Sequence, residues 1–140
     1  MNLNQVTLPA TDVVASVAFY RQLGFVQIVD APHYARFECP TGDATFSVHA
    51  AAPGDVGPGV VVYFEFESPD ALNAKVEGLR TRGIEFERLP ADERWLWREA
   101  RLRDPAGNRL CFYFAGANRR HPPWRIDTDA PALSASTTGF

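Results

Sequence analysis

The side chains best suited to acid–base and nucleophilic chemistry in this sequence are His49, Glu65 and Cys111. An imidazole and a carboxylate are common general acids and bases in enzymes. A cysteine becomes a nucleophile when a neighbour lowers the pKa of its thiol, and His49 could do so for Cys111. We therefore predict these three as catalytic candidates. A simpler interpretation is that Cys111 is a small buried apolar residue and His49 a hydrogen-bonded group in a polar cavity wall.

A second group of residues suits the binding of a flat organic molecule. Trp95 and Trp97 occupy alternate positions of a predicted strand, so their indoles would form one apolar wall. Together with Tyr63 and Tyr113 they could stack on an aromatic ligand, at about 0.5–1.5 kcal/mol per ring pair. Arg101 could hold a carboxylate of that ligand. The alternative is that both tryptophans are plain packing, in a closed cavity or a dimer interface.

The elements that must position these side chains follow the same order twice: a strand, a helix and three strands. In the first half we expect strands over residues 3–9, 25–29, 34–39 and 44–49, with a helix that Asp12 caps and Gly24 ends. In the second half we expect strands over residues 60–67, 84–88, 95–103 and 109–114, with a helix that Ser68 caps and Gly83 ends.

This repetition predicts the fold class. Asp12 and Asp70 stand at the two helix starts, and Gly42 and Gly107 stand in the turn before each last strand. One such unit cannot bury its sheet alone. We expect an α+β fold of two βαβββ modules whose mixed sheets curl around a cavity, with the helices outside.

The predicted domain covers residues 1–116. Module one spans residues 1–50, a Gly- and Pro-rich linker spans 51–59, and module two spans 60–116. Residues 117–140 form a Pro-rich tail whose end we expect to be flexible.

Composition excludes several classes of function. The chain of 140 residues has 46% hydrophobic residues and a net charge of −3, without the basic stripe of a nucleic-acid surface. The first residues lack the basic start and apolar core of a signal peptide, and no apolar run is long enough to cross a bilayer. Two cysteines are too few for a disulfide framework. We therefore expect a cytoplasmic protein with no nucleic-acid or membrane partner.

The repeated unit, the segment VTLPATDVVASVAFYRQLGF and the turn DPAGN together resemble the vicinal oxygen chelate superfamily. That superfamily includes glyoxalase I, bleomycin resistance proteins and extradiol dioxygenases. The resemblance covers residues 3–116 and implies the glyoxalase/bleomycin resistance/dioxygenase fold, homodimers and a cavity. The tail NRRHPPWRI is similar to one in unassigned bacterial members.

The resemblance also implies a divalent metal, held from corresponding positions on the first and last strands of each half. In this chain those positions are Gln5, Ser47, Tyr63 and Cys111. Only Gln5 matches a known family ligand, and Cys111 replaces the nearly universal Glu after the DPxGN turn. Such a set is a poor shell for a hard divalent ion. We therefore expect no cofactor, although a displaced metal site at His49, Glu65 and Cys111 is conceivable.

The sequence thus predicts a metal-free member that binds a small, planar or aromatic organic molecule. The residues predicted to bind that ligand are Gln5, Ser47, Tyr63, Trp95, Trp97, Arg101 and Tyr113. One alternative is a lyase, isomerase or dioxygenase with an atypical site around Gln5, His49, Glu65 and Cys111. Another is a non-catalytic dimer module.

Overall fold

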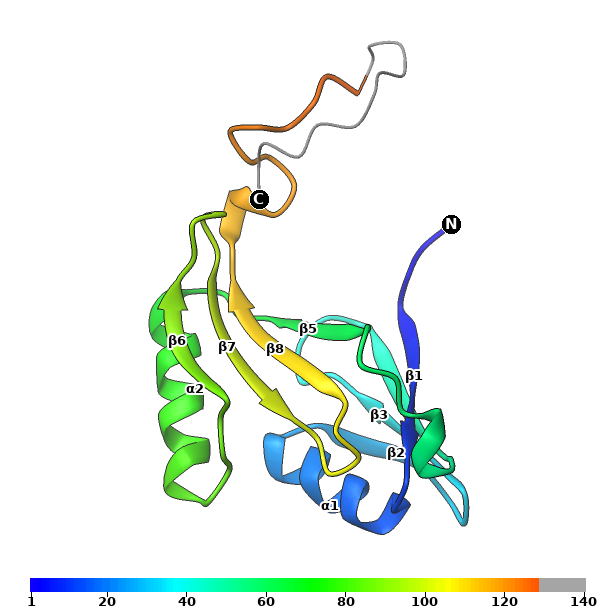
Figure 1. The fold of residues 1–140 in the computed structure, drawn as a ribbon. Helices are drawn as coiled ribbons and strands as arrows, with labels where there is room; N and C mark the ends of the chain where they lie inside the picture. The colour runs from blue at the N-terminus through cyan, green and yellow to red at the C-terminus, as the bar shows by residue number, and fades with distance from the viewer. Residues whose placement is uncertain (129–140) are drawn as a thin grey trace. The chain divides into compact units, whose positions relative to one another are not determined.

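The structure is a computed structural model, and it describes residues 1–128. It contains two four-stranded mixed sheets and two helices, in the predicted order of strand, helix and three strands (Figure 1). The sheets are not closed. The prediction of an α+β fold built from two βαβββ modules is therefore confirmed. The flexible end predicted for the tail falls in residues 129–140 and lies outside the described residues.

The described residues form two compact units. The first unit comprises residues 1–62 together with 102–110, and the second comprises residues 63–101 together with those from 111 onward. No helix in residues 1–128 is long and apolar enough to span a membrane.

The first sheet has the strand order β1-β4-β3-β2, with β1 parallel to β4 and the other neighbours antiparallel. The elements of this module are β1 (Gln5–Ala10), α1 (Val13–Leu23), β2 (Val26–Ala31), β3 (Tyr34–Glu38) and β4 (Thr45–Ala50). Each strand lies within two residues of the range predicted from the sequence.

Helix α1 begins and ends where the sequence predicts. The Asp12 carboxylate accepts a hydrogen bond from the Ala15 backbone N–H at 3.1 Å, and Gly24 ends the helix with φ at 106°. The helix buries Ser16, Tyr20 and Leu23 against the first sheet. Val13 and Val17 are only half-buried.

The DPAGN turn is tied to the first sheet and its helix. The Asp104 carboxylate accepts hydrogen bonds from the backbone N–H groups of Ala106 and Asn108, at 3.0 and 2.9 Å. It also accepts one from the Tyr20 hydroxyl at 2.7 Å. The Asn108 amide donates to the Pro9 carbonyl at 2.8 Å. The turn is thus an anchoring element, and Gly107 provides the positive φ of 93° that it needs.

The second sheet has the order β5-β8-β7-β6. The elements of this module are β5 (Val61–Glu65), α2 (Pro69–Thr81), β6 (Arg88–Asp92), β7 (Arg98–Arg103) and β8 (Arg109–Phe114); two short 3-10 helices lie at Pro53–Asp55 and Gly116–Asn118. Helix α2 lies alongside β6 (Figure 1). Ser68 caps it as predicted, and its residues Leu72, Val76 and Leu79 are buried.

Two strand predictions in this module were wrong. Strand β6 spans Arg88–Asp92, whereas the sequence predicted a strand over residues 84–88. The prediction missed this strand because Pro90 is typical of a loop. Strand β6 is at the sheet edge, where a residue without an N–H donor is tolerated.

The second error concerns the two tryptophans. Strand β7 begins at Arg98, so Trp95 and Trp97 lie in the turn before it and not along it. In this turn the N–H of Leu96 donates to the Glu93 carbonyl at 3.0 Å, and Leu96 adopts φ of 70°. A leucine rarely takes this left-handed conformation, so the sequence carries no turn signal there.

Candidate functional site

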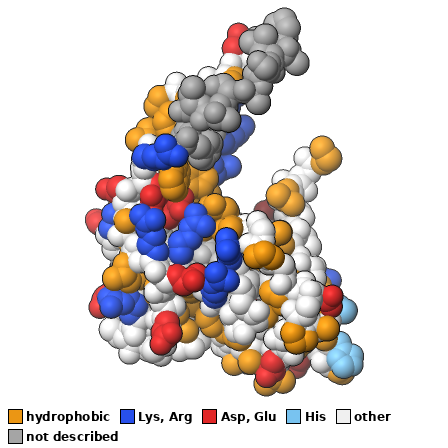
Figure 2. Space-filling view, in the orientation of Figure 1, with side chains coloured by type: hydrophobic (Ala, Val, Ile, Leu, Met, Phe, Trp, Pro, Cys, Tyr) orange, Lys and Arg blue, Asp and Glu red, His pale blue; other side chains and the backbone are white. Residues whose placement is uncertain are grey.

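A pocket of about 500 Å³ lies on the second unit. Its walls come from β5, from the turn before β7, from β7 itself and from the segment after β8. The lining residues are Tyr63, Trp95, Trp97, Glu99, Arg101, Asn118, Arg119, Pro122 and Trp124. Figure 2 shows Lys and Arg side chains gathered over the second sheet, with acidic side chains among them. The pocket therefore combines aromatic rings with charged groups.

Neighbouring rings and a hydrogen bond support the aromatic wall of the pocket. The Trp97 indole stacks on the Tyr113 ring, with centroids 4.6 Å apart and an interplanar angle of 17°. Tyr63 packs edge-on against both rings, at 5.8 Å from Trp97 and 5.6 Å from Tyr113. The Trp97 indole N–H donates to the Asn118 carbonyl at 3.3 Å. These contacts fix the orientation of Trp97 before any ligand arrives.

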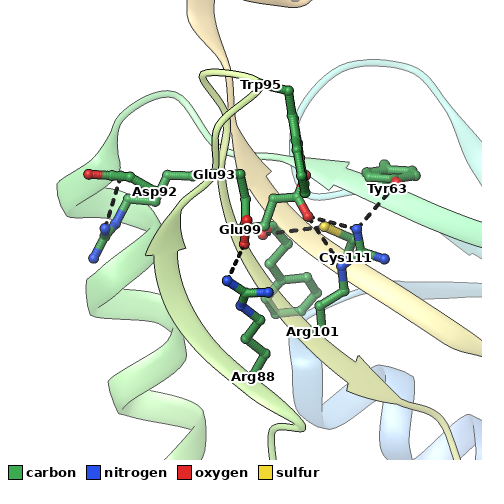
Figure 3. Close-up of polar contacts among 10 residues, drawn as sticks. Tyr63, Arg88, Asp92, Glu93, Trp95, Glu99, Arg101 and Cys111 are labelled. Atoms are coloured by element: carbon green, nitrogen blue, oxygen red, sulfur yellow. Dashed lines mark hydrogen bonds and ion pairs between the residues drawn. The ribbon is translucent and has the colours of Figure 1, made fainter. Parts of the chain in front are cut away.

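A buried carboxylate organises the charged side of the pocket (Figure 3). The Glu99 side chain is only 3% exposed. Its Oε1 accepts from Nη2 and Nε of Arg101, at 2.7 and 3.2 Å, and its Oε2 accepts from the Trp95 indole N–H at 2.7 Å. The Cys111 thiol is a further hydrogen-bond partner. Glu99 thereby fixes both an indole and a guanidinium at the pocket wall.

Arg101 remains partly open to solvent. Its side chain is 30% exposed, and its guanidinium carbon lies 5.6 Å from the centre of the Tyr63 ring, a cation–π contact. Nη2 is also 3.5 Å from the Tyr63 hydroxyl. Burial alone lowers the pKa of Arg101, but its hydrogen bonds to Glu99 and the surrounding charges raise it overall. The group is therefore a permanent cation facing the pocket.

Cys111 lies in an environment that favours a buried thiol over a nucleophile. The residue is fully buried, and burial together with the charge of Glu99 raises the pKa of its thiol to about 12, against the smaller opposite effect of Arg101. A thiol with so high a pKa is a weak nucleophile at neutral pH.

Glu65 and His49, the other two catalytic candidates, are both exposed. The Glu65 carboxylate lies 3.4 Å from Nε of Arg119 in the second unit, and its side chain is 51% exposed. His49 is in the first unit, where its Nδ1 lies 2.9 Å from the Ala50 carbonyl and its ring meets Tyr34 edge-on at 6.3 Å. The catalytic assignment of these residues stays a prediction.

Gln5 and Ser47 belong to a hydrogen-bond network in the first unit. The Gln5 amide donates to the Ser47 hydroxyl at 2.7 Å, and its oxygen accepts from the Thr45 hydroxyl. The Tyr34 hydroxyl lies 2.5 Å from that of Ser47 and accepts from Nε of Arg36 at 3.0 Å. The hydrogen bond with Ser47 lowers the pKa of Tyr34, and Arg36 adds to this against the opposite effect of burial. Tyr34 was not singled out from the sequence.

The side chains at the four family metal positions do not fit a hard divalent ion. Gln5 and Ser47 are neutral groups engaged with neighbours, and Tyr63 and Cys111 supply neither a carboxylate nor an imidazole. Divalent ions of this kind are bound mainly by carboxylates and imidazoles. Within residues 1–128, no cluster of three or more His, Cys, Asp or Glu side chains could hold a metal ion.

The structure brings five of the predicted ligand-binding residues together in the second unit: Tyr63, Trp95, Trp97, Arg101 and Tyr113. It also adds a wall that was not predicted from the sequence, made by Asn118, Arg119, Pro122 and Trp124. One signal was present: Trp124 is a large aromatic residue directly after two prolines in an otherwise polar segment. Such a residue needs a surface to cover it.

Comparisons with known proteins identify relatives of the whole domain. The family model of the Glyoxalase/Bleomycin resistance protein/Dioxygenase superfamily matches residues 2–112. A solved glyoxalase/bleomycin resistance protein/dioxygenase from Nocardioides is 27% identical, with 91% of this chain and 90% of that chain covered and a TM-score of 0.72. A family enzyme from Burkholderia phytofirmans PsJN is 23% identical, with 82% and 99% covered and a TM-score of 0.67.

A lactoylglutathione lyase from Agrobacterium tumefaciens shares the fold at 19% identity, with 81% of this chain and 92% of that chain covered and a TM-score of 0.67. No curated protein matches the sequence. Asn118, Arg119, Pro122 and Trp124 lie beyond the residues that the family model matches, so that match does not describe the outer wall of the pocket.

Proposed function

The chain belongs to the Glyoxalase/Bleomycin resistance protein/Dioxygenase superfamily, and on that premise we propose that it binds a small planar organic molecule without a bound metal. One fold in this superfamily can host many activities, so the proposal depends on the pocket and not on the membership. The observation that carries it is the aromatic wall, in which Trp97 is clamped by Tyr113 and Tyr63.

The size and chemistry of the pocket support this proposal. Its volume of about 500 Å³ lies inside the range of about 300–1,000 Å³ that is typical of small-molecule sites. Three tryptophans and a tyrosine offer flat faces, while Arg101 and Asn118 offer a few polar contacts that could orient a ligand. Stacking on such rings is favourable by about 0.5–1.5 kcal/mol per pair.

Donor chemistry supports the proposal that no metal is bound. Gln5, Ser47, Tyr63 and Cys111 include none of the carboxylate or imidazole ligands that a hard divalent ion prefers. Catalysis as a lyase, isomerase or dioxygenase, dimer formation and a cytoplasmic location stay predictions of the sequence.

The proposal is tested by tryptophan fluorescence titration with naphthalene-2-carboxylate and with cyclohexanecarboxylate, which shares the acid but not the aromatic rings. We expect the naphthalene compound to bind at least about tenfold more tightly, and Trp97→Leu to remove most of that difference. Tyr34→Phe, in the first unit and outside the pocket lining, is the control and should bind like the natural chain. Equal binding of the two acids would contradict the proposal.

A further inference from the structure

We infer that the ligand of this pocket is an aromatic anion. Its carboxylate group accepts hydrogen bonds mainly from Arg101 and additionally from Arg119. This inference rests on the proposed function and adds the charge of the ligand to it. It depends on which charged groups in the pocket are already neutralised and which remain available.

The only carboxylate that lines the pocket within residues 1–128 is already satisfied. Glu99 accepts two hydrogen bonds from Arg101 and one from Trp95, and it interacts with the Cys111 thiol. With its side chain 3% exposed, Glu99 also presents little surface to the pocket. It therefore has little capacity left for a cationic ligand.

Arg101 has the opposite character. A guanidinium has five N–H donors, and Nη1 takes no part in the contacts with Glu99 and Tyr63. Glu99 holds the group from one side, so the free edge is oriented before a ligand binds. The two N–H groups of Nη1 can donate charge-assisted hydrogen bonds to a carboxylate.

Arg119 provides a second cation in the same pocket. Its contact with Glu65 is 3.4 Å long, and both side chains are about half exposed. Ion pairs of this exposed kind contribute only about 0–1 kcal/mol, so Arg119 can exchange Glu65 for a ligand oxygen at little cost. The pocket lining thus carries two arginines against one carboxylate, and Glu65, the acidic partner of Arg119, is half exposed and lies outside the lining.

A cationic ligand fits this arrangement less well, although aromatic walls can bind ammonium groups through cation–π contacts. The guanidinium of Arg101 already occupies that kind of contact over the Tyr63 ring. A second cation nearby would be repelled by Arg101 and Arg119. The charge arrangement therefore favours an anion over a cation of the same shape.

The test compares three probes of nearly equal shape by isothermal titration: naphthalene-2-carboxylate, naphthalene-2-carboxamide and 2-naphthylmethylammonium. We expect the carboxylate to bind at least about tenfold more tightly than the amide, and the ammonium compound to bind most weakly. The quantity that matters is the ratio of the amide Kd to the carboxylate Kd. A variant that merely loosens the fold weakens both probes and leaves this ratio near its original value.

The variants should change that ratio in a graded way. Arg101→Lys keeps the positive charge beside Glu99 but loses the planar guanidinium that fixes the Nη1 donors, and it should reduce the ratio to about threefold or less. Arg119→Gln should reduce it by a smaller factor. Arg88→Lys is the matched control, because Arg88 pairs with Glu93 on the same sheet but does not line the pocket, and it should leave the ratio unchanged.

Each contrary result has a separate meaning. If the amide binds the natural protein as tightly as the carboxylate, aromatic binding stands and the inference about charge is overturned. If the ammonium compound binds most tightly, the inference is likewise overturned. If none of the three binds, the proposed function fails as well. An unchanged ratio in Arg101→Lys would remove Arg101 as the contact.

Discussion

Trp97 and Tyr113 form a parallel stack in which one ring lines the pocket and the other supports it. The centroids are 4.6 Å apart, and Tyr113 is buried while Trp97 faces the pocket. Tyr113 comes from β8 and Trp97 from the turn before β7. Tyr113 of strand β8 therefore supports the Trp97 ring that lines the ligand site.

Replacing Tyr113 tests whether this support matters for binding. Tyr113→Leu removes the supporting ring, so Trp97 gains freedom that a ligand must restrict again. We expect the Kd for naphthalene-2-carboxylate to rise by about two- to tenfold, which corresponds to the strength of one aromatic pair. Tyr113→Phe keeps the ring and should bind like the natural chain. An equal loss in both variants would show that the hydroxyl, and not the stack, is responsible.

The two cysteines should differ in their reaction with a disulfide reagent such as DTNB. Cys111 is fully buried with a thiol pKa raised to about 12, whereas Cys39 is half-buried. We expect only Cys39 to be modified in the folded protein near neutral pH, and both thiols to be modified in denaturant. Rapid modification of Cys111 in the Cys39→Ala variant would contradict the burial of this thiol.

Stability should fall at alkaline pH. Burial raises the pKa of Cys111 from its ordinary value of 9.0 to about 12, and it raises that of Tyr113 from 10.0 to about 12. The unfolded chain then loses these protons before the folded one does, so their contribution is complete below pH 9 and is lost as the pH rises toward 12. Chemical denaturation at several pH values should show a free energy of unfolding that declines above pH 9.

Cys111→Ala provides the check on this interpretation. The variant should be less stable than the natural chain at neutral pH, but its stability should decline less steeply above pH 9. The difference in slope between the two proteins is the expected result. Parallel pH curves for the natural chain and the variant would show that this thiol does not titrate differently in the folded state.

The hydrogen bond between Tyr20 and Asp104 should contribute measurably to the stability of the first unit. Both groups are buried and 2.7 Å apart, and Asp104 also holds the DPAGN turn. We expect Tyr20→Phe to lower the free energy of unfolding by about 1–3 kcal/mol, measured by urea denaturation. Tyr63→Phe, at an exposed tyrosine, should change it by less than about 0.5 kcal/mol. Similar losses in both would argue against a special role for this bond.

Local signals in the sequence were sufficient for most of the fold. Both helices begin at their predicted caps, Asp12 and Ser68, because a side-chain oxygen there satisfies a free backbone N–H. The repeat and the DPAGN turn predicted the order of elements in both modules. These features depend on neighbours within a few residues, which a sequence displays directly.

The parts that were missed depend on contacts between distant residues. Leu96 adopts a left-handed conformation without glycine, so the turn that carries Trp95 and Trp97 resembled a strand. The wall containing Trp124 comes from a segment whose position is set by tertiary contacts such as that between Trp97 and Asn118. For the site, residue types indicated a ring-rich pocket with an arginine, but the neutralisation of Glu99 became visible only in the structure.

The most direct test of the account is a calorimetric titration of naphthalene-2-carboxylate into protein stripped of metal with EDTA, repeated after a divalent ion such as Zn²⁺, Mn²⁺ or Ni²⁺ is restored. We expect saturable binding at one site per chain, with the same Kd in the chelated and the restored samples. Binding that appears only after the metal is restored would contradict it.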